Sequence, residues 1–138
     1  MKKLNNLGVK INESPKRIVK IASEARNRIQ KRTNKGLDYN NTPMQRLDPD
    51  YAEYKKGKGK RGIPDLHFEG HMLRAMQVEP KGTGADIYFN NEAERQKAYK
   101  HHFGRGHMPA RKFFMLGSKL RKYINTEIHK PIKKAIGA

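Results

Sequence analysis

Cysteine is absent from this chain of 138 residues, so disulfide bonds and thiolate metal ligands are excluded. Hydrophobic residues make up 35% of the chain and aromatic residues 8%. Because both shares are low, we expect part of the chain to lie in an arm or loop outside the core of a single domain. No apolar run approaches the roughly 18 residues of a membrane-spanning helix, and the N-terminal residues lack the apolar stretch of a secretory signal. These absences predict a soluble intracellular protein without membrane contact.

Acidic residues are also scarce, since 13 Asp and Glu stand against 31 Lys and Arg, for a formal net charge of +18. The excess lies at both ends. Residues 1–35 carry 11 basic and 2 acidic residues (+9), residues 97–138 carry 11 and 1 (+10), and residues 36–96 carry 9 and 10 (−1). Such ends attract nucleic acid, an anionic membrane or an acidic protein patch. The alternative is a solvated surface, although the excess is larger than solubility needs.

Motifs for catalysis are missing as well. The sequence has no GxSxG and no P-loop, and its few carboxylates form no recognisable acid–base pair. His101, His102 and His107 lie close together, but adjacent helical residues point in different directions and no HExxH motif is present. We therefore predict a protein that is not an enzyme and that has no metal or other cofactor. A small metal-dependent nuclease is the alternative.

Periodicity predicts an α+β domain over residues 1–138, in which N-terminal and C-terminal helices pack on a small antiparallel or mixed β-sheet. The N-terminal helix, at about 15–35, has Ser14 as its N-cap and one apolar stripe, formed by Ile18, Ile21, Ala22, Ala25 and Ile29. The other predicted elements are a hairpin at about 73–90 with a four-residue loop at 81–84, a helix at about 91–103 capped by Asn90 or Asn91, a strand at about 110–116, and a C-terminal helix at about 118–130 that Pro131 breaks or kinks.

Residues 36–64 are rich in proline and glycine, which predicts a long arm or loop in the middle of the chain. Loops of this length are usually functional or disordered. The tip, KKGKGKRG (55–62), is basic and flexible in composition. We predict that it contacts phosphates or an acidic partner through Lys55, Lys56, Lys58, Lys60 and Arg61. Since no base-reading motif is present, any contact with nucleic acid would be non-specific.

Residues 104–116 have the composition of a protein–protein contact. Gly104 and Gly106 permit unusual backbone conformations, and Arg111 suits a bidentate contact with a carboxylate of a neighbour. On a strand, Phe113 and Phe114 would point to opposite faces, so that one anchors the core and the other meets a partner. The alternative is that both belong to the core. The predicted interface residues are His107, Met108, Pro109, Arg111, Phe113, Phe114, Tyr51 and Tyr54.

The stretch 98–117 resembles the signature of phage virion-morphogenesis or tail-completion proteins. In that family Tyr-Ala-x-x-His-x-x-Gly is followed by a variable loop, Pro-Ala-Arg-Pro-Phe and a short apolar run. Here Ala98 precedes Tyr99, His101 or His102 takes the histidine place, and Gly104 follows. The residues that match the second part are Pro109, Ala110, Arg111 and Phe113, with Lys112 in place of the second proline.

A second segment, DLHFEGHMLRAM (65–76), is similar to the family's Leu-x-x-Thr-Gly-x-Leu-x-x-Ser. Leu66, Gly70 and either Met72 or Leu73 match, whereas the Thr and Ser do not. The resemblance covers most of the chain, and its specific part is confined to 98–117.

The resemblance implies a structural subunit of the neck or upper tail of a virion, assembled in the host cytoplasm. Such a subunit would complete the tail or join head and tail as a ring, a hexamer or dodecamer of its own copies. Its other partners would be connector or head-closure proteins and tail terminator or tube proteins, with DNA in the channel. The alternative is a basic protein that binds nucleic acid non-specifically.

Overall fold

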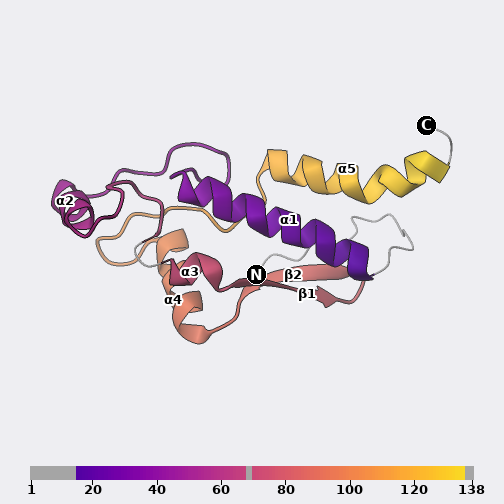
Figure 1. The fold of residues 1–138 in the computed structure, drawn as a ribbon, viewed down its shortest axis with the longest axis horizontal. Coiled ribbons are helices and arrows are strands. Elements are labelled where there is room, and N and C mark those ends of the chain that lie inside the picture. Colours follow the sequence, from indigo (N-terminus) through magenta and orange to yellow (C-terminus); the bar gives the residue numbers. More distant parts are fainter. Residues whose placement is uncertain (1–14, 68–69, 136–138) are drawn as a thin grey trace.

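The computed structural model describes residues 15–67 and 70–135. Within these ranges five helices and one two-stranded antiparallel sheet form an α+β fold, which confirms the predicted class (Figure 1). The N-cap predicted at Ser14 lies outside the described residues. The elements in chain order are α1 (Pro15–Asn34), α2 (Pro49–Gly57), α3 (His71–Arg74), β1 (Met76–Lys81), β2 (Gly84–Phe89), α4 (Glu92–Phe103) and α5 (Ser118–Ala135).

Helix α1 is the centre of the fold, because it lies between the hairpin and α5 (Figure 1). Its apolar stripe is buried, and Ala22 and Ala25 are fully inaccessible. From α5, Leu120, Ile124 and Ile128 are buried at the four-residue spacing of one helical face. Burial of each such isoleucine stabilises the fold by about 1.5–3 kcal/mol. The amphipathic pattern therefore accounts for both helices.

The hairpin is tighter than its sequence predicts. Lys81 pairs with Gly84, so its loop has two residues, Gly82 and Thr83, in place of the predicted four. Gly82 has φ 57°, a conformation that glycine adopts at little cost and that two-residue hairpin loops require. The strands also begin later than residue 73, because 71–74 form the short helix α3.

Helix α4 is present at nearly its predicted bounds. The side chain of Asn91 accepts a hydrogen bond from the N–H of Glu94 at 2.9 Å, so Asn91 is the cap. Gly104 ends the helix with φ 74°. A Cβ atom at Gly104 would lie 2.7 Å from the carbonyl oxygen of Met108, because the following loop turns back on the helix end. Only glycine fits this position without a backbone shift.

The strand predicted at 110–116 is wrong, because this segment is irregular. Its polar backbone atoms bond to several elements and not to a neighbouring strand. The N–H of Arg111 donates to the carbonyl of His101 at 2.8 Å, and the N–H of Tyr39 donates to that of Lys112 at 3.0 Å. Arg32 donates to the carbonyl oxygens of Phe113, at 2.9 Å, and of Met115. Burial lowers the pKa of Arg32 to about 10, against the opposing effect of Asp38, so its guanidinium stays charged at neutral pH.

Of the two effects predicted for Pro131, a break or a kink, the break is wrong, because helix α5 continues past this proline to Ala135. Proline has no N–H, which leaves the carbonyl four residues earlier without its helical donor. That carbonyl belongs to Glu127, and the Arg17 side chain of α1 donates a hydrogen bond to it. The packing of α1 on α5 thus supplies a replacement donor at the proline.

The middle segment, 36–64, is partly helical, which corrects its prediction as a continuous loop. Asp48 caps α2 by accepting hydrogen bonds from the N–H groups of Asp50, at 3.0 Å, and Tyr51, at 3.4 Å, and Pro49 occupies the first turn. An antiparallel bridge between Leu37 and Pro43 closes the start of the segment. In Figure 1, α2 lies at the end of the molecule opposite the hairpin turn. We call residues 36–64 the arm.

Candidate interaction surface

Arg111 lies in the interior and not at the surface predicted for it. It is 6% exposed, and its guanidinium donates to the carbonyl oxygens of Gln45 at 3.0 Å and Arg46 at 3.2 Å. Burial lowers its pKa from the usual value. Arg111 therefore attaches the arm to the segment that follows α4, instead of presenting a fork to a neighbouring carboxylate.

Phe113 and Phe114 both contact the core, because the segment that contains them is not a strand. Phe113 is fully buried and Phe114 is partly buried. The ring of Phe89 in β2 lies 5.0 Å from the ring of Phe114 and 6.5 Å from that of Phe113, measured between centroids. The alternative in which both side chains belong to the core agrees with this packing.

The remaining predicted interface residues are accessible, except that Pro109 is half-buried. His107 is exposed, and Met108 is 38% exposed. On α2, Tyr51 is 45% exposed and Tyr54 is 54% exposed, and their rings stack with centroids 6.2 Å apart. We call Tyr51 and Tyr54 the arm tyrosines.

Two exposed aromatic residues of α4 were not among the predicted contacts. Tyr99 is 46% exposed and Phe103 is 58% exposed, with ring centroids 4.7 Å apart. The guanidinium carbon of Arg105 lies 4.9 Å from the centroid of Tyr99, within the range of a cation–π contact. Their spacing of four residues indicates a shared helix face, but only the packing of α4 shows that this face points to solvent. We call Tyr99 and Phe103 the α4 aromatic pair.

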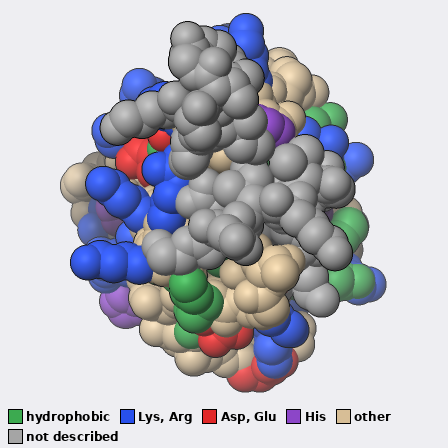
Figure 2. All heavy atoms as spheres, turned by 90° about the vertical axis from the view of Figure 1, so that its right-hand side faces the viewer, with side chains coloured by type: hydrophobic (Ala, Val, Ile, Leu, Met, Phe, Trp, Pro, Cys, Tyr) green, Lys and Arg blue, Asp and Glu red, His purple; other side chains and the backbone are tan. Residues whose placement is uncertain are grey.

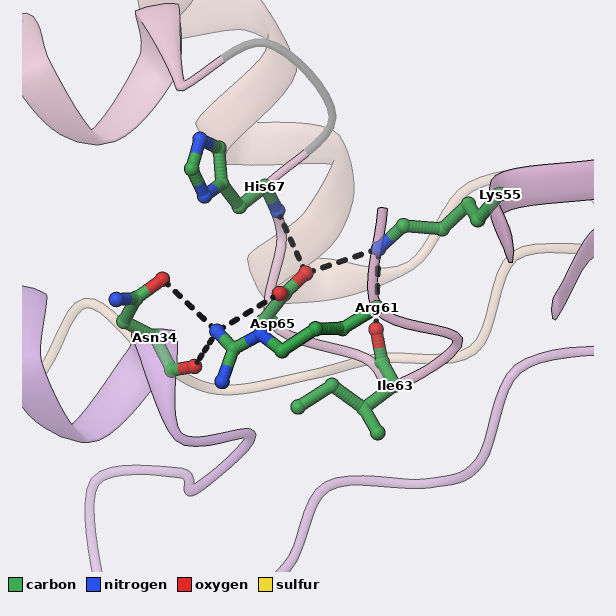
Figure 3. Close-up of polar contacts among 6 residues, drawn as sticks. All are labelled: Asn34, Lys55, Arg61, Ile63, Asp65 and His67. Atoms are coloured by element: carbon green, nitrogen blue, oxygen red, sulfur yellow. Dashed lines mark hydrogen bonds and ion pairs between the residues drawn. The ribbon is translucent and has the colours of Figure 1, made fainter. Parts of the chain in front are cut away.

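The basic tip of the arm divides into an internal and a surface part. Lys55 is 3% exposed, and its Nζ donates to Asp65 Oδ1 at 2.9 Å and to the carbonyl of Ile63 at 3.1 Å. Arg61 reaches the other carboxylate oxygen at 3.0 Å and also contacts Asn34 of α1 (Figure 3). Lys55 is thus unavailable to a phosphate, contrary to its prediction. The side chain of Arg61 is 54% exposed beside its contacts within the chain, so its predicted contact stays a prediction.

Lys56, Lys58 and Lys60 form the surface part of the tip. Lys56 pairs with Glu53 at 3.2 Å, and both side chains are largely exposed. The Nζ of Lys58 lies 5.7 Å from the ring centroid of Tyr54. These three lysines and the arm tyrosines lie at one end of the molecule, and all five side chains are exposed to solvent.

Positive charge dominates the surface beyond the arm. Figure 2 shows the face at the hairpin end of Figure 1, where Lys and Arg side chains lie mainly at the left, top and right margins and acidic side chains form small patches. Most described acidic side chains are already paired with a cation of the same chain: Glu24, Glu53, Asp65, Asp86, Glu92, Glu94 and Glu127. Because Lys and Arg outnumber Asp and Glu, the charge that remains beyond these ion pairs is positive.

A cleft of about 720 Å³ separates the arm from α3, α4 and the loop after α4. Its apolar lining comes from Leu47, Leu66, Met72, Met108 and Pro109. Glu94, Lys97 and His101 line it from α4. Burial lowers the pKa of His101 from its usual value, and the nearby charges of Arg111 and Lys97 lower it further.

Within the described ranges, no three His, Cys, Asp or Glu side chains form a group that could hold a metal ion. No helix among the described residues is long and apolar enough to cross a membrane. Comparisons with family models, curated proteins and solved structures found no match to this chain.

Proposed function

We propose that this chain is a structural, non-enzymatic protein of a tailed-phage virion. It would be a tail-completion or head–tail connector subunit, located in the neck and assembled as a ring between connector and tail tube. The observation that carries the proposal is the resemblance of residues 98–117 to the tail-completion signature. Three residues of this signature have a structural role in this fold. Gly104 adopts the left-handed conformation at the end of α4, Arg111 donates to the main chain of the arm, and Phe113 is buried in the core.

The exposed aromatic residues support a role in assembly. Tyrosine, phenylalanine and methionine are enriched at protein interfaces, where they bury large areas with few rotatable bonds. The arm tyrosines, the α4 aromatic pair and Met108 are accessible in the isolated chain. We propose them as the subunit contacts, in place of the buried Arg111 and Phe113.

The positive net charge of the chain favours neighbours with negatively charged surfaces. Subunits that each carry +18 repel one another, so a ring needs compensating negative charge. In the neck, acidic surfaces of connector, head-closure, tail terminator or tube proteins would supply it, as would DNA in the channel. The exposed lysines of the arm tip would face one of these neighbours.

The test is the mass of the concentrated protein in solution at low and high salt, with negative-stain images of any oligomer. At high salt, where the repulsion between subunits of charge +18 is screened, we expect a discrete ring, because salt weakens its apolar contacts little. At low salt, without an anionic neighbour, we expect a smaller ring fraction. Tyr51→Ser combined with Tyr54→Ser should reduce the ring fraction, whereas Lys119→Ser, at an exposed position of α5, should not. A protein that stays monomeric and binds duplex DNA tightly contradicts the proposal.

The second candidate is non-specific binding of nucleic acid, favoured by the three exposed lysines beside the arm tyrosines. With three phosphate contacts, the logarithm of the affinity should fall against the logarithm of salt concentration with a slope of about −3. Replacing Lys56, Lys58 and Lys60 together by alanine should remove that dependence. Replacing Lys55 cannot serve as the test, because its loss disturbs the fold.

A further inference from the structure

We propose that the α4 aromatic pair binds single-stranded nucleic acid, with a base stacked on Phe103 and the neighbouring phosphates on Lys100 and Arg105. The inference rests on the second candidate function, binding of nucleic acid, and adds to it a class of ligand and a surface separate from the arm tip. Under this inference Tyr99 and Phe103 contact bases in place of a neighbouring subunit.

The rings of the α4 aromatic pair are accessible and are held in place from behind. Phe103 is 58% exposed, and its ring centroid lies 4.7 Å from that of Tyr99. The ring of His102 lies 4.7 Å from the ring of Phe103 and 6.2 Å from that of the buried Phe113, measured between centroids. The N–H of Phe114 donates to Nδ1 of His102 at 3.4 Å, which orients this ring. The pair is therefore positioned before a ligand arrives, which lowers the entropy cost of binding.

The surroundings of the pair are cationic. Residues 95–126 include nine Lys and Arg and no Asp or Glu. Lys100 is exposed next to Tyr99 in the sequence, and the guanidinium carbon of Arg105 lies 4.9 Å from the centroid of the Tyr99 ring. Glu92 is seven residues from Tyr99, about 10 Å along the helix axis, and is already paired with a cation of its own helix. A phosphate beside the rings thus meets cations without a competing carboxylate from the same segment.

This arrangement fits a ligand that combines planar rings with closely spaced negative charges. Unpaired bases stack on aromatic side chains while the phosphates between them contact Lys and Arg, so single-stranded nucleic acid has the required chemistry. A duplex offers its phosphates, but its bases are stacked on one another and are closed to Phe103. The core of a protein interface is depleted in charged residues, whereas cations adjoin the rings of this pair.

The arm tyrosines have a different charge pattern. They also expose aromatic rings beside cations, but the exposed carboxylates of Asp50 and Glu53 belong to the same helix. A strand with its bases stacked on these rings would bring its phosphates close to those carboxylates, which repel them. Tyr54 is therefore the matched control for Phe103, because the two side chains are exposed to a similar extent, 54% and 58%.

The test measures the fluorescence anisotropy of a labelled oligothymidylate of about 12 nucleotides and of its duplex with oligodeoxyadenylate, each titrated with the full-length protein. Phe103→Ser should raise the Kd for the single strand about tenfold and leave the Kd for the duplex within about twofold. Tyr54→Ser should change neither Kd by more than about twofold. Arg105→Ser should reduce the salt slope for the single strand by about 0.7, as expected for the loss of one phosphate contact. Circular dichroism checks that each variant folds.

A second measurement detects stacking directly. The chain contains no tryptophan, so Phe103→Trp places a single indole at the site. This variant should retain the affinity of the wild type for the single strand, and a stacked base should quench its fluorescence. The duplex should leave the fluorescence unchanged. An abasic strand with the same number of phosphates should bind the wild type and Phe103→Ser equally.

The outcomes separate this inference from the function on which it rests. Equal Kd changes for single strand and duplex in Phe103→Ser, or unquenched fluorescence of Phe103→Trp, would overturn the inference and leave non-specific binding of nucleic acid intact. Absence of binding to either probe would overturn both. A smaller ring fraction of Phe103→Ser, with unchanged affinity for the single strand, would assign the α4 aromatic pair to the subunit contact instead.

Discussion

The Nζ atom of Lys55 lies 2.9 Å from Oδ1 of Asp65, and both side chains are 3% exposed. Asp65 also accepts hydrogen bonds from the N–H of His67 and from Arg61, which itself contacts the end of α1. One buried carboxylate therefore joins α2, the basic tip and α1. The arm is held by this ion pair at one point and by Arg111 at another.

Asp65→Ala should destabilise the protein by about 3–5 kcal/mol, because it leaves the charge of Lys55 buried without a partner. Urea denaturation measures the loss. Glu53→Ala removes the exposed pair with Lys56 and should cost at most about 1 kcal/mol. Equal effects of the two changes would show that Lys55 is not buried in solution.

Arg111→Lys should loosen the arm, because an ammonium cannot reproduce the planar fork that reaches Gln45 and Arg46. We expect faster proteolytic cleavage within residues 44–64 and a stability loss of about 1–3 kcal/mol. The neighbouring exposed Lys112 offers the matched control, Lys112→Arg, for which cleavage should be unchanged. Cleavage of Arg111→Lys at the wild-type rate would contradict this role.

Stability should depend on pH through His101. Its pKa is lowered in the folded state, so below about pH 6.5 the unfolded chain binds the proton more readily. The contribution of neutral His101 is therefore present above that pH and is lost as the pH falls towards the folded pKa. Denaturation at several pH values should show a smaller acid-side loss for His101→Gln than for the wild type. His107→Gln, at an exposed position, should retain the wild-type pH dependence.

Phe113→Ala should cost about 3–5 kcal/mol, as expected for a fully buried aromatic ring, and Phe114→Ala should cost less. The thermal midpoint of unfolding measures both. Tyr54→Ala is the control for an exposed aromatic residue and should change the midpoint little. A larger effect for Phe114 than for Phe113 would contradict the deeper burial of Phe113.

Apolar periodicity was sufficient to predict α1 and the face of α5 that packs on it. The cap and the end of α4 were predicted from asparagine and glycine at its two ends. These features depend on residues close in sequence, and local patterns report them well. The failures have a common cause. In each case a residue far away in the sequence supplies the hydrogen bond. The segment 110–116 has the composition of a strand, but its carbonyls accept hydrogen bonds from Arg32 and from the N–H of Tyr39. Pro131 is tolerated within α5 because Arg17 donates to the carbonyl of Glu127.

Residue types alone indicated a cationic, cysteine-free chain with a proline- and glycine-rich middle. They also indicated that residues 104–116 make specific contacts, but they did not show whether these residues lie at the surface or in the interior. Which of the five cations at the arm tip are buried, and which aromatic residues face solvent, was decided only by tertiary packing. Burial depends on contacts such as Lys55 with Asp65 and Arg111 with Gln45, which join residues 10 and 66 positions apart. No local pattern encodes those distances.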